Sequence, residues 1–151
     1  PIYAVKQATE NAKRNNLSDT VKFRVANVLD ELPRLAADGE KYDVVILDPP
    51  AFTKSREATK NAIKGYREIN MKGLKLVKDG GFLATCSCSH FMTQELLAKT
   101  VKEAAKATHK RLRQVEFCTQ GPDHPILWAN SANVPESYYL KFFIFQVVDE
   151  K

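Results

Sequence analysis

The chain has 151 residues, a net charge of +5 at pH 7 and a pI of about 9.1, and 44% of its residues are hydrophobic. This size and composition predict one globular domain, and the lack of any run of about 18 apolar residues argues against a transmembrane helix or a membrane partner. Three cysteines do not make a disulfide framework, which favours a reducing, cytoplasmic location, and the basic charge favours a polyanionic partner such as RNA.

The first 40 residues predict two helices around one strand. Apolar residues recur at helical spacing through residues 4–15, which predicts a helix. Apolar and basic residues then alternate over residues 21–25, a pattern typical of a half-exposed strand. Asp30 is expected to cap a short helix whose apolar positions are residues 32, 35 and 36.

The most informative stretch follows at residues 42–52. Its apolar run, residues 44–47, does not alternate, which predicts a strand buried on both faces in a parallel sheet. Pro49 and Pro50 end this strand because neither can donate to a sheet ladder. Asp48 therefore lies at the carboxyl end of a buried strand, where open α/β sheets bind their ligands. We interpret this stretch as the floor of an active site.

The rest of the chain continues the alternation of helices and strands. We expect a helix over 59–77, a turn at 78–81, a strand over 82–87, a helix over 93–108 capped by Thr93, a strand over 112–117, a long connection over 119–137 and a last strand over 138–148. This order predicts an α/β class with a mainly parallel sheet. Neither a G-x-G-x-x-G nor a P-loop pattern occurs.

A second informative stretch contains two cysteines. If the strand stays extended, Cys86, Cys88 and His90 share one face at the end that lies beside Asp48. A thiolate there would be a strong nucleophile, whereas the alternative is a pair of small buried hydrophobic residues, an interpretation that suits Cys86 better than Cys88. No metal is expected, because zinc sites draw a second pair of ligands from another element and Cys118 is a poor candidate.

Taken together, residues 42–52, 65–70 and 80–89 resemble the class I S-adenosylmethionine-dependent methyltransferases. Within that class the chain resembles the bacterial and archaeal large-subunit ribosomal RNA (cytosine-C5) methyltransferases, which residues 123–126 and 139–141 also fit. The resemblance implies a Rossmann-like methyltransferase fold with strand order 3-2-1-4-5-7-6, mainly parallel with an antiparallel last strand. It also implies S-adenosyl-L-methionine as cofactor and ribosomal RNA as partner.

The resemblance further implies a covalent mechanism. In 5-methylcytosine enzymes a thiolate attacks C6 of the cytosine, and related RNA enzymes carry this nucleophile in a Thr-Cys-Ser motif, seven residues after the second glycine of a Gly-Gly pair. Counting from Gly81 reaches Cys88 rather than Cys86. Asp48 would hydrogen-bond the N3–N4 edge of the base and support the charge passing through the ring. Phe52 would stack on the flipped base, unless it is simply a packed aromatic residue.

The remaining site residues follow from the same resemblance. Residues Ala26, Asn27 and Val28 match the segment that meets the adenine ring, although Asn27 alone would read as a turn residue. Asp48 and Pro49 would border the cofactor. The substrate contacts would be Pro50, Phe52, Lys54, Arg56 and His124. For the basic residues from Lys54 to Arg67, a merely solvated helix face remains the alternative.

Two departures from the family pattern matter. Ala51 stands where a subset of RNA cytosine methyltransferases has a second cysteine, so another base would have to complete product release. The chain also resembles only the carboxyl-terminal part of one catalytic domain, residues 1–151, with its first two strands missing. We therefore expect weak cofactor binding and an exposed sheet edge that would favour a homodimer.

Two other functions remain open. Methylation of a guanine or adenine nitrogen would use the Asp-Pro-Pro motif without a thiol. A noncatalytic RNA-binding module would use the basic charge alone.

Overall fold

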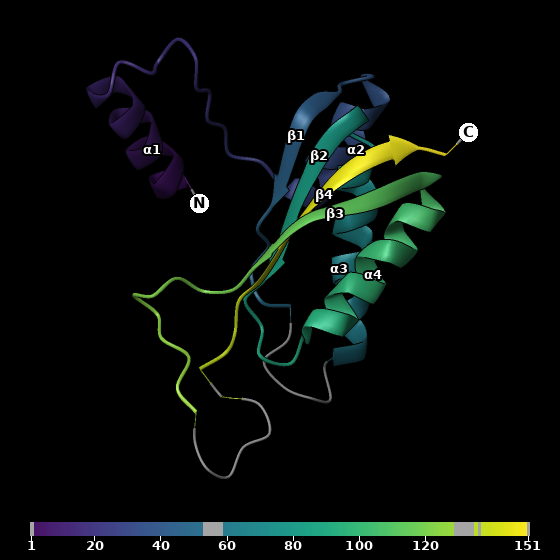
Figure 1. Cartoon of the computed structure of the whole chain (residues 1–151). Coiled ribbons are helices and arrows are strands. Elements are labelled where there is room, and N and C mark those ends of the chain that lie inside the picture. Colours follow the sequence, from purple (N-terminus) through teal and green to yellow (C-terminus); the bar gives the residue numbers. More distant parts are fainter. Residues whose placement is uncertain (1, 53–58, 129–134, 136, 151) are drawn as a thin grey trace.

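The computed structural model describes residues 2–52, 59–128, 135 and 137–150. The elements in these ranges are α1 (Ile2–Arg14), α2 (Val28–Ala37), β1 (Tyr42–Leu47), α3 (Thr59–Leu74), β2 (Val77–Ser87), α4 (Gln94–Ala107), β3 (Lys110–Cys118) and β4 (Lys141–Asp149) (Figure 1). No helix within them is both long and apolar enough to cross a bilayer. The predicted substrate residues Lys54 and Arg56 lie outside the described residues.

The four described strands form one mixed sheet in the order β1-β2-β4-β3. β1 and β2 are parallel, and β4 is antiparallel to both of its neighbours, β2 and β3. Three strands therefore point in one direction and only the last strand is reversed. This arrangement confirms the α/β class and matches the 4-5-7-6 part of the expected strand order.

The prediction of a strand at residues 21–25 is wrong. The chain between α1 and α2 contains no strand, and Val21, Phe23 and Val25 are exposed. A strand requires a hydrogen-bonding neighbour, and none of the described strands pairs with this segment. Alternating polarity gave the right pattern for a strand, but the pattern alone cannot supply a partner.

Two local boundaries also differ from expectation. Asn27, and not Asp30, caps α2, because the Asn27 Oδ1 accepts a hydrogen bond from the Leu29 backbone N–H at 3.2 Å. Residues 78–81 do not end a helix but run within β2, which begins at Val77. Gly81 is needed there because a Cβ would lie 2.8 Å from the Asp43 carbonyl oxygen, across the irregular start of the β1–β2 pair.

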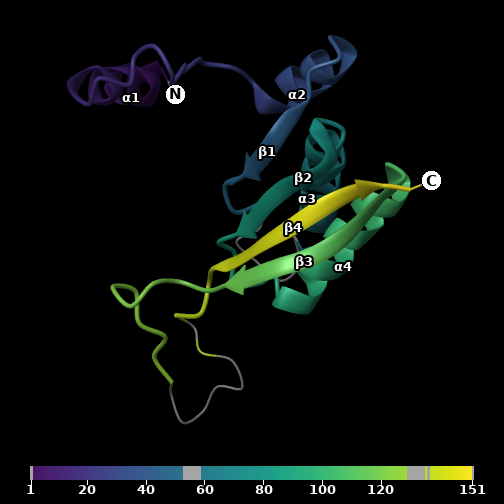
Figure 2. The ribbon, with the colours of Figure 1, turned by 45° about the horizontal axis from the view of Figure 1, so that its top comes forward.

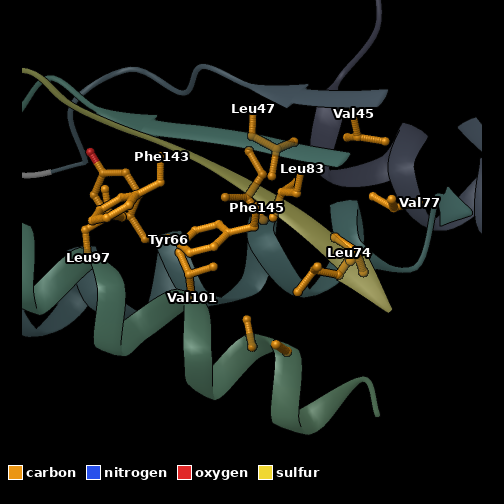
Figure 3. Close-up of a cluster of buried hydrophobic side chains, with 14 of the residues drawn as sticks. Val45, Leu47, Tyr66, Leu74, Val77, Leu83, Leu97, Val101, Phe143 and Phe145 are labelled. Carbon is orange, nitrogen blue, oxygen red and sulfur yellow. The ribbon is translucent and has the colours of Figure 1, made fainter. Parts of the chain in front are cut away.

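The hydrophobic core lies between the sheet and the helices α3 and α4, which cover one face (Figure 3). Tyr66 of α3, Leu83 of β2 and Phe143 of β4 are each at most 1% exposed. At Gly73 the helix α3 comes so close to β1 that a Cβ would stand 2.8 Å from a Leu47 methyl carbon. This close packing holds the carboxyl end of β1 firmly against the helix layer.

The opposite side of β1 is uncovered in the described chain. Val44 and Ile46 are 53% and 68% exposed, and β1 forms one edge of the sheet. Figures 1 and 2 show α1 apart from the sheet, joined to α2 by the extended segment. The prediction that β1 is buried on both faces is therefore wrong for the described residues, because only Val45 and Leu47 are covered. The predicted exposed hydrophobic edge is present at β1.

Candidate active site

Asp48 follows directly on β1, where the sheet register brings it beside β2. Leu47 pairs with Thr85, so the next residues, Asp48 and Cys86, are adjacent. The Cys86 thiol donates a hydrogen bond to Asp48 Oδ1 at 3.1 Å. Asp48 itself is exposed, while the following Pro49 is buried. A carboxylate and a thiol thus meet at the carboxyl ends of two parallel strands, as the sequence predicted.

Cys86 is a neutral hydrogen-bond donor in this pair. It is 5% exposed, and burial, followed by its hydrogen bond to the Asp48 carboxylate, raises its pKa to about 12. A thiol with this pKa is protonated at neutral pH and is a poor nucleophile. The interpretation of Cys86 as a small buried residue fits the structure, with the added role of contacting Asp48.

We predict that Cys86 resists alkylation in the folded protein. At pH 8 to 9 iodoacetamide should modify the exposed Cys88 and Cys118 and leave Cys86 intact, because the folded state keeps that thiol protonated and covered. Peptide mass spectrometry of each cysteine measures the labelled fraction. In denaturant all three should react. Equal labelling of Cys86 and Cys88 in the native protein would contradict this.

Cys88 is placed differently from Cys86, because β2 ends at Ser87 and the chain turns. Cys88 is exposed, while Ser87 and Ser89 on either side of it are buried. The Ser87 hydroxyl donates to the Tyr66 phenol oxygen at 2.8 Å and accepts from the Ser89 backbone N–H at 3.2 Å. These bonds fix the turn so that the thiol of Cys88 faces outward.

A cavity of about 790 Å³ adjoins the end of β1. Its lining residues are 25–29, 46–50, Phe52 and Ile69. It therefore gathers every residue assigned to the cofactor, Ala26, Asn27, Val28, Asp48 and Pro49, although residues 26–28 and 48–49 are far apart in sequence. The cavity is within the size range of small-molecule sites in proteins.

Five apolar lining residues were not predicted as site residues: Val25, Leu29, Ile46, Leu47 and Ile69. Leu29 begins α2, Ile46 lies on the uncovered face of β1, and Ile69 comes from α3. The available signal was the unalternating run of β1, which requires apolar cover on both faces and hence predicts that Ile46 meets either a helix or a ligand. Nothing in the sequence pattern of α3 singles out Ile69.

The Asn27 side chain is already engaged at the start of α2. Besides capping the helix, its Nδ2 donates to Asp30 Oδ2 at 2.6 Å. Asn27 therefore caps α2 and also lines the cavity. Its amide group is thus held by two hydrogen bonds at the start of α2.

Phe52 and His124, two of the predicted substrate contacts, differ in their position relative to the cavity. Phe52 is half-buried, lines the cavity and packs edge-on against Tyr66, with ring centroids 4.8 Å apart. His124 is in the long connection, where it contacts the Tyr139 ring and Asp123, and it does not line the cavity. Among the described residues, no three potential metal-ligating side chains gather in one place.

Comparison with known proteins gives a consistent result. Residues 3–134 match a family model described as a methyltransferase domain. Ribosomal RNA large subunit methyltransferase I of Shewanella frigidimarina is 37% identical over 145 residues, which are 95% of this chain and 36% of that protein. The protein of the same name from Pseudoalteromonas atlantica is 37% identical over 146 residues, 93% of this chain and 36% of that protein. The chain thus spans about a third of the length of these relatives.

Solved structures support the fold. TrmN from Thermus thermophilus superposes with a TM-score of 0.59 at 18% identity, over 97% of this chain and 34% of that one. SMU.776 in complex with SAH superposes with a TM-score of 0.58 at 21% identity, over 81% of this chain and 30% of that one. At these identities the likeness concerns the fold alone. The match of the family model over most of the chain shows that the chain belongs to the methyltransferase-domain family.

Proposed function

We propose that the chain is the catalytic part of an S-adenosylmethionine-dependent ribosomal RNA methyltransferase that methylates C5 of a cytosine through a covalent bond between Cys88 and C6. The observation that carries the proposal is the placement of an exposed Cys88 just past the end of β2, next to the strand end that carries Asp48 and the cavity. The names of the relatives point to the same class of RNA substrate.

The residues suit the individual steps of this chemistry. The Cys88 thiolate adds to C6, which makes C5 nucleophilic. When bound, S-adenosylmethionine would supply the methyl group that C5 takes up. The C5 proton then leaves to a base and the bond between sulfur and C6 breaks, which restores the ring and the thiolate. Asp48 supports the charge at the N3–N4 edge, and the Cys86 thiol holds one of its oxygens at 3.1 Å.

The cavity fits the adenine side of this cofactor. Its lining combines apolar side chains with the start of α2, which suits a flat, partly apolar ring. Ala26, Asn27, Val28, Asp48 and Pro49 would hold the adenine portion. Pro50, Phe52 and His124 would meet the RNA base, and Lys54 and Arg56 its phosphates.

We also propose that residues 1–151 are the carboxyl-terminal part of one catalytic domain. The uncovered apolar side of β1 supports this, since a buried parallel strand normally has neighbours on both edges and cover on both faces. The share of the relatives that the chain spans, 36%, agrees with it. Binding of the methionine and ribose portions would then depend on residues from the rest of the domain.

An RNA carrying 5-fluorocytidine tests the covalent mechanism. Fluorine cannot leave as a proton does, so the adduct should accumulate when the full-length protein is given this RNA and S-adenosylmethionine. We expect a denaturation-resistant complex on a gel, with the RNA attached to the peptide that contains Cys88. Methyl transfer without any adduct would favour the nitrogen methyltransferase, and salt-sensitive RNA binding without transfer would favour the noncatalytic module.

A further inference from the structure

Lys141, the first residue of β4, is a buried cation that the proposed mechanism leaves without a role. It is 1% exposed, which is unusual for lysine. Its Nζ donates to the Ser89 carbonyl at 2.6 Å and to the Tyr139 carbonyl at 2.7 Å, and lies 5.6 Å from the centre of the Tyr138 ring. The register places Lys141 directly opposite Ser87. The ammonium therefore lies beneath the turn that carries Cys88.

The contacts of this ammonium bracket Cys88. Ser87 is held by the Tyr66 phenol, and Ser89 is held from one side by the Ser87 hydroxyl and from the other by Lys141. The Lys141 ammonium contacts Ser89, the residue that follows Cys88, and consecutive Cα atoms are about 3.8 Å apart. The charge is therefore close to the residue that carries the thiol. The thiolate form of Cys88 and the ammonium of Lys141 interact electrostatically, and this interaction raises the pKa of Lys141.

Burying a charge here is costly. Desolvation lowers the pKa of Lys141 to about 8, in spite of the opposing effect of Cys88. An apolar side chain of the same length would fill the space without that cost. A buried cation with a shifted pKa beside a candidate nucleophile is more typical of a functional site than of a packing element.

Two other titratable groups that interact electrostatically with Cys88 do not supply this charge. Tyr66 of α3 and Cys86 of β2 both interact with the Cys88 thiolate, and burial raises the pKa of each. Both are neutral at pH 7. Of these neighbours, Lys141 alone is a cation.

We propose that Lys141 is the positioning and electrostatic partner of Cys88: its ammonium holds the Ser89 carbonyl under the turn and places a positive charge next to the residue that carries the thiol. The assignment rests on the proposed role of Cys88 as the nucleophile. Lys141 acts through Cys88 and need not touch the RNA, because it is covered by the turn. No atom is transferred to or from Lys141 in this role.

Alkylation of Cys88 tests the proposal without any methyl transfer, so its result is independent of whether the proposed reaction occurs. The rate of iodoacetamide modification of Cys88 is measured by peptide mass spectrometry from pH 6 to 10 in the wild-type chain and in Lys141→Met, Lys141→Gln and Lys141→Arg. Lys102→Met, which removes an exposed lysine of α4, is the matched control. Protection of Cys86 reports that each variant is folded.

At pH 7 we expect Cys88 to react about tenfold more slowly in the Met and Gln variants, as the loss of a nearby unit charge predicts. Because Lys141 loses its charge as the pH rises through about 8, the advantage of the wild-type chain should shrink above that pH. The Arg variant should stay within about threefold of wild type at pH 7, and Lys102→Met should not differ from it.

An unchanged Cys88 rate in folded Lys141→Met would overturn the proposal. So would a wild-type rate in Lys141→Gln, which keeps a hydrogen-bond donor but not the charge. Labelling of Cys86 in Lys141→Met would show that this variant is not folded. The Cys88 rates of the Gln and Arg variants then decide: a slow Gln variant with a near-wild-type Arg variant supports the proposal, and a wild-type rate in Gln overturns it.

Discussion

Replacing Cys88 by alanine is expected to abolish methyl transfer, with a loss on the order of 10⁴-fold or more, while leaving the protein folded. The loss is large because the reaction has no other group to add to C6, and without that addition C5 of cytosine is not nucleophilic. The fold should tolerate the change because Cys88 is exposed and lies beyond the end of β2. Transfer of radiolabelled methyl groups to RNA by the full-length protein measures the effect.

Cys86→Ala is the matched control. It removes the neighbouring cysteine, the one that contacts Asp48, and should lower turnover by about tenfold or less, the usual worth of one hydrogen bond. Cys86→Ser, which keeps a donor, should recover part of that loss. Retained turnover in Cys88→Ala, or a greater loss in Cys86→Ala than in Cys88→Ala, would sink the assignment of Cys88 as the nucleophile.

The sequence predicted the parts of the fold whose partners lie within the chain. β1, β4 and the helices α3 and α4 were found close to their expected residues, and β2 ends where expected, because each combines a clear apolar pattern with an end signal such as the proline pair after Asp48 or the Thr93 cap. Residues 21–25 have an equally clear period but no neighbouring strand, and the prediction failed there. Periodicity describes which face a segment can bury; whether the burial happens depends on the rest of the sheet.

The candidate site was predicted in outline and not in detail. Strand direction alone implied that the ends of β1 and β2 meet, and so brought Asp48 to a cysteine. Which cysteine depended on where β2 ends, and that depends on the buried hydrogen bonds of Ser87 and Ser89 with residues from other elements. Lys141 entered only through the resemblance of residues 139–141 to the family, and its burial could not be predicted, because a lysine before an apolar strand normally points to solvent.

Replacing Tyr66 should disturb both the packing of the core and the geometry of the candidate site. Its side chain is fully buried in the core, its ring packs against Phe52, and its phenol oxygen accepts the Ser87 hydroxyl bond. We expect Tyr66→Ala to lower the free energy of unfolding by about 3–5 kcal/mol, because it removes a large buried ring and leaves a cavity. Tyr66→Phe keeps the ring and should cost only about 1–2 kcal/mol, the value of the lost hydrogen bond.

Urea denaturation followed by circular dichroism measures both changes, and Tyr3→Ala provides the control. Tyr3 is 79% exposed on α1, so its replacement should change the free energy of unfolding by less than about 0.5 kcal/mol. If Tyr66→Ala cost no more than Tyr66→Phe, the ring would not be part of the core as described. Tyr66→Phe should in addition increase the mobility of the 87–89 turn, because Ser87 loses the acceptor that ties the turn to α3. In the folded Phe variant we therefore expect methyl transfer by Cys88 to fall by a larger fraction than the free energy of unfolding.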